Sequence, residues 1–215
     1  AQEAPDLYLA ERGTHDPAPL VAASVGPYGA YLADGSEYRG DYDVDEDALT
    51  EFHAGRLRLL AAAQPDLLAC ETLPCLIEAR AIVRALRAEK IRIPAWFSFS
   101  CRDVAHISDG TEIAECARFL DGVPEAAAIG LNCTAPQYVE ELIRTIRQET
   151  AKPIIVYPNS GESYDASDKT WHGAAEDFGA LARRWRSAGA RLIGGCCRTS
   201  PREIVEISTW AKNAE

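Results

Sequence analysis

Six short apolar segments alternate along the chain with segments in which apolar residues recur at helical spacing. The apolar segments cover residues 19–25, 66–70, 93–99, 126–131, 153–157 and 191–194, and the helical patterns cover 45–63, 76–87, 111–120, 136–148, 174–188 and 201–211. Strands that are apolar on both faces are typical of parallel sheets covered by helices. The alternation predicts an α/β fold with a parallel sheet. Periodicity alone leaves open a doubly wound sheet or part of a (β/α)8 barrel.

Polar residues and cysteines gather at the ends of these apolar segments or just after them. In parallel α/β folds, binding sites form beyond the carboxyl ends of the strands, so side chains at these positions should meet on one face. We expect the substrate-binding residues to be Glu71, Thr72, Ser98, Asn132, Asn159 and Gly195.

Two adjacent thiols, Cys196 and Cys197, directly follow the last apolar segment. Adjacent cysteines rarely bond each other without backbone distortion, whereas two thiolates in one pocket can share a soft metal such as zinc. Cys133, which ends another apolar segment, is the candidate third ligand. Three thiolates leave the fourth position of zinc open. A zinc ion with these ligands can hold an incoming thiol in its ionised form, which points to a sulfur nucleophile. Buried or redox-active thiols are the alternative.

Length and composition narrow the class of protein further. A chain of 215 residues with 47% hydrophobic residues is long enough for one substantial core, and we expect a single domain. The net charge of -11 argues against a nucleic-acid partner and suits a small cationic substrate. No apolar run approaches the roughly 18 residues of a membrane span, and residues 1–5 lack a signal-sequence pattern. We therefore expect a cytoplasmic protein with no membrane association.

The chain contains seven cysteines, an odd number that fits reduced thiols in metal or catalytic use better than a disulfide framework. Cys70 and Cys101 are possible fourth metal ligands, although Cys70 lies inside an apolar segment typical of the core.

A long loop is predicted over residues 28–42, which contain Tyr28, Tyr31 and Tyr38 among glycines and acidic residues. Long ordered loops in compact domains are usually functional, and a solvated excursion is the alternative.

Four motifs stand at or near the ends of predicted strands: Gly194-Gly195-Cys196-Cys197-Arg198-Thr199, Gly130-Leu131-Asn132-Cys133, Val25-Gly26-Pro27-Tyr28-Gly29 and Tyr157-Pro158-Asn159-Ser160-Gly161-Glu162. Together they resemble the zinc-dependent homocysteine S-methyltransferases, and most closely the bacterial members that use S-methylmethionine. The resemblance implies a (β/α)8 barrel of the TIM type in which Cys133, Cys196 and Cys197 bind Zn2+.

The resemblance also implies an activity. The zinc-bound homocysteine thiolate would attack the methyl group of a sulfonium donor, S-methylmethionine or S-adenosylmethionine, and form methionine. Glu71 would hold the homocysteine amino group, and capping of the following helix is its alternative role. The rings of Tyr28, Tyr31 and Tyr38 would cover the donor, because aromatic faces attract compact cations. No separate protein base is assigned.

The start of the chain departs from the family pattern. Family members begin with a strand that carries an Asp-Gly pair, followed by a second strand, and neither precedes Ala1. We therefore expect residues 1–215 to form about the last six β/α units of a single barrel domain, completed by an N-terminal segment or a partner chain. The competing functions are a thiol redox module built on Cys196 and Cys197 and a non-catalytic zinc-binding fragment.

Overall fold

The computed structural model describes residues 3–12, 18–165, 170–172 and 177–212. The main sheet contains β1 (Ala22–Val25), β2 (Leu67–Leu73), β3 (Ala95–Phe99), β4 (Ala126–Asn132), β5 (Ile154–Tyr157) and β8 (Ala190–Ile193). β6 (Ser163–Asp165) and β7 (Thr170–His172) form a short antiparallel hairpin. The helices are α1 (Glu3–Arg12), α2 (Tyr28–Leu32), the 3-10 helix η1 (Ser36–Tyr38), α3 (Glu46–Ala62), α4 (Leu76–Ala88), α5 (Ile113–Asp121), α6 (Pro136–Glu149), α7 (Phe178–Ala188) and α8 (Pro201–Lys212). Within the described ranges, no helix has the length and hydropathy needed to cross a membrane.

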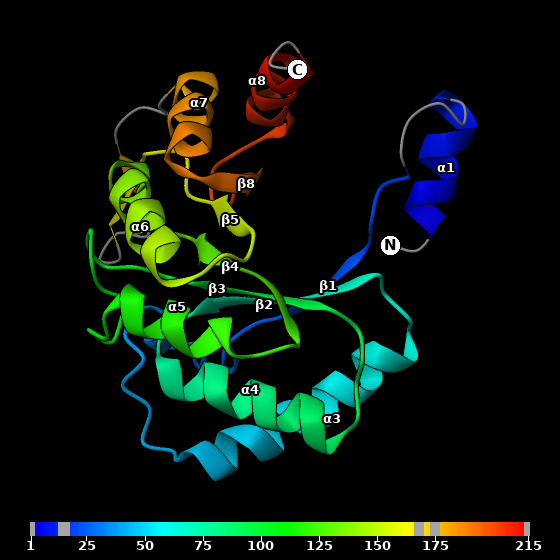
Figure 1. The fold of residues 1–215 in the computed structure, drawn as a ribbon, viewed down its shortest axis with the longest axis vertical. Coiled ribbons are helices and arrows are strands. Elements are labelled where there is room, and N and C mark those ends of the chain that lie inside the picture. The colour runs from blue at the N-terminus through cyan, green and yellow to red at the C-terminus, as the bar shows by residue number, and fades with distance from the viewer. Residues whose placement is uncertain (1–2, 13–17, 166–169, 173–176, 213–215) are drawn as a thin grey trace.

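The main sheet is parallel throughout, and its strand order β1-β2-β3-β4-β5-β8 follows the chain without reversal. A doubly wound sheet reverses its strand order, which allows helices to cover both faces. Without a reversal, successive right-handed crossovers place their helices on the same face. Figure 1 shows α3, α4, α5 and α6 along the outside of the curved run of strands. The predicted parallel α/β fold is confirmed, and the topology is that of barrel units.

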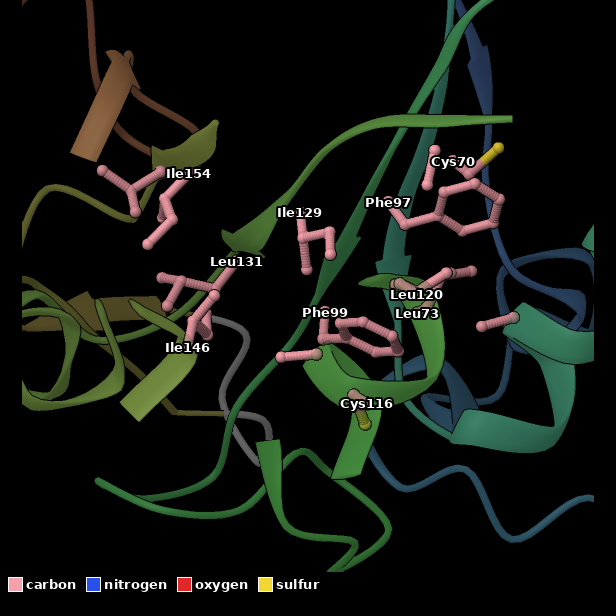
Figure 2. Packing of buried hydrophobic residues seen from close by; sticks show 14 of the residues in the cluster. Cys70, Leu73, Phe97, Phe99, Cys116, Leu120, Ile129, Leu131, Ile146 and Ile154 are labelled. Atoms are coloured by element: carbon pink, nitrogen blue, oxygen red, sulfur yellow. The ribbon is translucent and has the colours of Figure 1, made fainter. Parts of the chain in front are cut away.

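The hydrophobic core lies between the sheet and these outer helices. Phe97 and Phe99 of β3 and Leu131 of β4 have no exposed surface. Figure 2 shows the two phenylalanines near Leu120 and Cys116 of α5, and Leu131 beside Ile146 of α6. Because successive side chains of a strand point to opposite faces, the alternate positions of the same strands point away from the helices. Those alternate positions carry the polar residues described below.

β1 and β8 are the edge strands of the main sheet, and the described residues show no pairing between them. Apolar side chains are exposed along these edges: Leu20, just before β1, is 68% exposed, and Leu192 in β8 is 46% exposed. An unpaired strand edge presents free backbone hydrogen-bonding groups. The described sheet is therefore an open arc and not a closed barrel.

The prediction of a loop over residues 28–42 is wrong in part, because this segment contains α2 and η1. Pro27 precedes α2 in an extended conformation, and Ala33, with a φ of 56°, ends it. A five-residue helix is too short for a helical period to show in the sequence. The same limit explains why the three-residue strands β6 and β7 were not predicted. The helix predicted from residue 174 begins at Phe178 in the structure, and residues 174–176 lie outside the described part.

Gly130 in β4 allows the close approach of β5. A Cβ atom at this position would lie 1.6 Å from the carbonyl oxygen of Ile155. We predict that Gly130→Ala lowers the free energy of unfolding by about 2 kcal/mol or more, since the two strands must separate. Urea unfolding measures the change. The control is Gly55→Ala in α3, where a Cβ would meet nothing within 4 Å; it should be neutral or stabilise by about 0.5–1 kcal/mol. Equal destabilisation by both substitutions would contradict the packing argument.

Candidate metal centre

Three thiols meet at the carboxyl ends of β4 and β8. Cys133 follows β4 directly, and Cys196 and Cys197 lie shortly after β8. The Sγ atom of Cys133 lies 2.7 Å from that of Cys196 and 3.7 Å from that of Cys197. All three sulfur atoms lie within 4.8 Å of one another, and all three residues are half-buried. Since β4 and β8 both pair with β5 in parallel, the sheet brings residues 63 positions apart in the sequence to one edge.

Local contacts fix the segment that carries the two adjacent thiols. The N–H of Cys196 donates to the carbonyl oxygen of Pro158, just after β5, at 2.8 Å. Gly195 has no space for a side chain, because a Cβ there would lie 2.4 Å from Oγ1 of Thr199. The Thr199 hydroxyl in turn donates to the Cys196 carbonyl oxygen at 2.7 Å. The glycine before the thiols therefore permits a tight turn that is tied to the neighbouring strand.

Two residues of the site have a left-handed backbone: φ is 47° at Cys133 and 60° at Thr72. This conformation is unfavourable for residues other than glycine and costs of the order of 1–3 kcal/mol each. Asn132 lies between them and holds Thr72 in two ways. Its Oδ1 accepts from the Thr72 N–H at 2.8 Å, and its Nδ2 donates to Thr72 Oγ1 at 2.8 Å. Asn132 thus links the end of β2 to the strand end that carries Cys133.

The close packing of the thiols shifts the pKa values of Cys133 and Cys197 in opposite directions. Hydrogen bonding to the Cys133 thiol lowers the pKa of Cys197 to about 3. Contacts with Cys196 and Cys197, together with burial, raise the pKa of Cys133 above its usual range. The protein alone therefore favours one thiolate and opposes ionisation of Cys133. A bound cation reverses this preference, because metal ligation requires the thiolate form.

The donor set fits zinc. Zn2+ takes cysteine sulfur in tetrahedral sites, and three protein thiolates leave one position for another ligand. The other two thiols weighed as fourth ligands lie elsewhere. Cys70 is fully buried in the core, and the Cys101 sulfur donates to the carbonyl oxygen of Phe99 at 3.9 Å. Neither belongs to the metal-ligating cluster found in the described ranges.

A chain of polar contacts runs across the strands toward the thiols. Glu71 accepts a hydrogen bond from Ser24 Oγ at 2.6 Å and from the Tyr157 hydroxyl at 2.9 Å. The indole N–H of Trp96 donates to the Tyr157 hydroxyl oxygen at 2.8 Å. Glu71 does not cap the following helix, since the side chain at the N-cap of α4, Cys75, makes no capping hydrogen bond and both Glu71 oxygens are engaged elsewhere.

Ser24 and Trp96 were not predicted as site residues, and Tyr157 was named only as the first residue of the 157–162 motif, without a role of its own. The available signal was the two-residue period of the strands: Trp96 lies two positions before Ser98 in β3, and Tyr157 pairs in register with Asn132. Residues that share this face point away from the outer helices. The two-residue period therefore places Trp96 and Tyr157 on the same face as Ser98 and Asn132.

The remaining predicted substrate residues lie at different depths. Ser98 is fully buried; its hydroxyl lies 2.9 Å from Asn132 Oδ1 and 2.5 Å from the Tyr157 hydroxyl, and its single hydrogen is donated to one of the two. The Asn159 N–H donates to the Thr134 carbonyl oxygen at 3.1 Å, and its buried Oδ1 has no hydrogen-bond partner in the described part of the chain. Ser98 is therefore part of the polar network, whereas Asn159 retains an unused acceptor.

Tyr28 anchors the aromatic segment of α2 and η1. Its ring packs edge-on against Phe52 of α3, with ring centroids 5.0 Å apart. Its N–H donates to Glu78 of α4 at 2.5 Å, and the same carboxylate oxygen lies 2.8 Å from His53 Nε2. Glu78 and His53 have no exposed surface. This buried pair ties the start of α2 to α3 and α4.

The other two tyrosines differ in their surroundings. Tyr31 is 71% exposed. Burial of the Tyr38 hydroxyl raises its pKa, and the neighbouring Cys133 and Cys197 thiols add to the effect. The structure thus brings Tyr38 to the thiols and leaves most of Tyr31 open to solvent.

Barrel units with three thiols at their strand ends define a class of protein: α/β-barrel proteins with a thiolate metal site. The sequence model of the homocysteine S-methyltransferase family matches residues 1–211, and the chain belongs to this family. It is 56% identical to homocysteine S-methyltransferase YbgG of Bacillus subtilis over 217 residues, which cover 99% of this chain and 69% of the relative. It is 49% identical to the homocysteine S-methyltransferase of Escherichia coli, over 96% of this chain and 67% of the relative.

The fold has a close counterpart among solved structures. The crystal structure of the metallated form of the homocysteine methyltransferase MmuM from Escherichia coli superposes with a TM-score of 0.85 at 43% identity. The superposition covers 99% of this chain and 67% of that chain. The chain therefore spans about two thirds of the length of these relatives.

We predict that Cys196→Ser sharply lowers zinc content, from about one ion per chain to less than about half under the same chelator competition. Apparent zinc affinity in thiolate sites is of the order of 10–16 kcal/mol, so loss of one of three ligands is readily measured. Metal analysis of the reduced protein is the measurement. Cys101→Ser is the control, because this thiol also follows a strand but lies outside the cluster. Full zinc retention after single serine substitutions at all three cluster positions would reject the assignment.

Proposed function

We propose that the complete protein transfers a methyl group from a sulfonium donor to the thiol of homocysteine and forms methionine. The observation that carries the proposal is the placement of three thiols within 4.8 Å of one another on the same strand-end edge as the Glu71 carboxylate. A thiolate metal site binds sulfur, and a carboxylate pairs with an ammonium group. Homocysteine carries both groups on one short chain.

Cys133, Cys196 and Cys197 are the proposed ligands of Zn2+, which would keep the substrate thiol ionised at neutral pH. The residues of the chain supply the orientation. Glu71 binds the substrate ammonium at a position fixed by its own hydrogen bonds. The other proposed substrate-site residues are Thr72, Ser98, Asn132, Asn159 and Gly195, of which Ser98 and Asn132 act through their hydrogen bonds to neighbouring side chains.

The proposed methyl donor is S-methylmethionine, with S-adenosylmethionine as the second candidate. In the transfer, the homocysteine sulfur forms a bond to the methyl carbon while the bond from that carbon to the sulfonium sulfur breaks. The donor leaves as a neutral thioether, and the thiol proton is released to solvent. Tyr28, Tyr31 and Tyr38 form the proposed donor surface, because aromatic faces attract a sulfonium cation by about 0.5–2 kcal/mol.

We also infer that further β/α units, about two by length, cover the open edges at β1 and β8. The exposed Leu20 and Leu192 support this inference, and so does the share of the relatives that the chain spans. The units would come from an N-terminal segment or from a partner chain, and would shield the metal site and Glu71 from water. A cytoplasmic location belongs to the same proposal, since the three ligand thiols must stay reduced.

A thiol redox function for Cys196 and Cys197 is the alternative, and a non-catalytic zinc-binding role is a second. Cys133 lies within 2.7 Å of Cys196 and 3.7 Å of Cys197, so the adjacent pair is not set apart as a dithiol. The three-thiol arrangement favours metal binding over a two-cysteine redox couple.

Methionine formation tests the proposal. We predict that the chain alone, loaded with zinc, is a poor catalyst, and that joining the first two β/α units of the Bacillus subtilis relative before residue 1 raises its rate at least about tenfold, since water exclusion strengthens the site. The measurement is methionine produced from homocysteine with S-methylmethionine or S-adenosylmethionine. Reversible dithiol titration without methyl transfer would favour the redox alternative. Zinc binding without any methyl transfer by the joined protein would favour the non-catalytic one.

Tyr31→Leu should raise the KM for the sulfonium donor by about 2- to 20-fold, because one aromatic face is lost. Tyr31 is 71% exposed, so its replacement should leave the fold intact. Steady-state kinetics with each substrate varied in turn provides the measurement. The KM for homocysteine should stay unchanged and serves as the internal control. An equal effect on both substrates, or none, would assign this residue a purely structural role.

A further inference from the structure

We propose that Tyr157 is a positioning residue that fixes Glu71 as the receptor for the substrate ammonium and thereby sets the preference for amino thiols over thiols without an amino group. This inference rests on the proposed function. In it, Tyr157, supported by Trp96, orients the Glu71 carboxylate.

Both oxygens of the Glu71 carboxylate are already engaged in the protein alone. Ser24 donates to Oε1 at 2.6 Å and Tyr157 donates to Oε2 at 2.9 Å. An ionised carboxylate offers about four acceptor positions, so about two remain for an ammonium group. The carboxylate is therefore oriented and still has capacity to bind a cation.

The Tyr157 hydroxyl has a neighbour that can act only as a hydrogen-bond donor. The indole N–H of Trp96 can only donate, so the Tyr157 oxygen accepts there, at 2.8 Å. The two rings meet nearly at right angles, at 82° with centroids 6.2 Å apart. The Ser98 hydroxyl lies 2.5 Å from the same oxygen. With Ser98 as the donor in that contact, the Tyr157 oxygen accepts from both Trp96 and Ser98, and its single hydrogen goes to Glu71. Burial and the nearby Glu71 charge raise the pKa of Tyr157 above its usual range, so the hydroxyl retains that hydrogen.

The backbone alone does not determine where the Glu71 carboxylate lies. The register of β2 with β3 shifts between Cys70 and Leu73, and Thr72 has a left-handed backbone. A bulge of this kind re-aims the side chains of the bulged strand. Side-chain hydrogen bonds therefore complete the orientation, and the contact from Tyr157 ties Glu71 to β5, three strands away in the sheet order.

Tyr157→Phe tests the proposal, because it keeps the ring and removes the donor. Binding is measured by calorimetry on the complete, zinc-loaded protein with homocysteine and with 4-sulfanylbutanoate, which lacks the amino group. We expect affinity for homocysteine to fall about tenfold and affinity for the analogue to change less than about twofold, as for loss of one hydrogen bond to a charged group. Zinc content should be unchanged. An equal loss for both thiols, or no loss, would overturn the proposal.

Two further variants separate positioning from a general effect on packing. In a Glu71→Gln background, Tyr157→Phe should lower homocysteine affinity little further, since both changes act on one receptor. Full additivity of the two losses would overturn the proposal. Trp96→Phe removes the donor behind Tyr157, keeps an aromatic ring and should shift selectivity in the same direction; it provides the test if Tyr157→Phe does not fold. Tyr138→Phe on α6, outside the polar network, is the control and should leave both affinities unchanged.

Methionine formation by the unsubstituted protein reports separately on the proposed function. Absence of product, together with a selective loss of homocysteine binding in Tyr157→Phe, would reject the methyl transfer and support the role of Tyr157. Product formation with no difference between the two thiols in any variant would support the transfer and reject the positioning role.

Discussion

Parallel pairing in chain order is the constraint on which the rest of this structure depends. Because β1 to β5 and β8 all run in the same direction, their carboxyl ends lie along one edge of the sheet. Cys133 and Cys196 reach that edge from different β/α units, with no covalent link between them. The metal centre is therefore a product of sheet topology, and its local turns only refine the positions of the sulfur atoms.

Because side chains alternate along each strand, one face of the sheet carries apolar core residues and the other carries polar residues of the site. Residues such as Phe97 and Leu131 pack under the helices and stabilise the fold (Figure 2). The alternate positions carry Trp96 and Tyr157, whose hydrogen bonds lead to Glu71. The free energy gained by burying apolar side chains on one face thus offsets the conformational entropy lost in ordering the polar network on the other.

Strained backbone also occurs where these strands end, at the proposed site. Thr72 and Cys133 both have positive φ, and Asn132 supports the first of them with two hydrogen bonds. Residues in such conformations persist when the surrounding structure over-determines them, as it does here. The opposite situation holds at β1 and β8, where apolar side chains are exposed along unpaired edges. Strained backbone thus occurs at the strand ends of the proposed site, whereas unpaired strands with exposed apolar side chains occur where the barrel would close.

The sequence by itself determined the strand and helix segments and the thiols to consider, because burial leaves a local period in the chain. It could not distinguish a doubly wound sheet from barrel units, since pairing order is not a local property; the unreversed order of the strands decided this. It missed α2, which is too short to show a period. It also missed Ser24 and Trp96 and gave no role to Tyr157, because these residues became part of the site only when β1, β3 and β5 were placed beside β2 and β4. Motifs name residues one segment at a time, whereas hydrogen bonds between strands depend on which strands are neighbours and in which register.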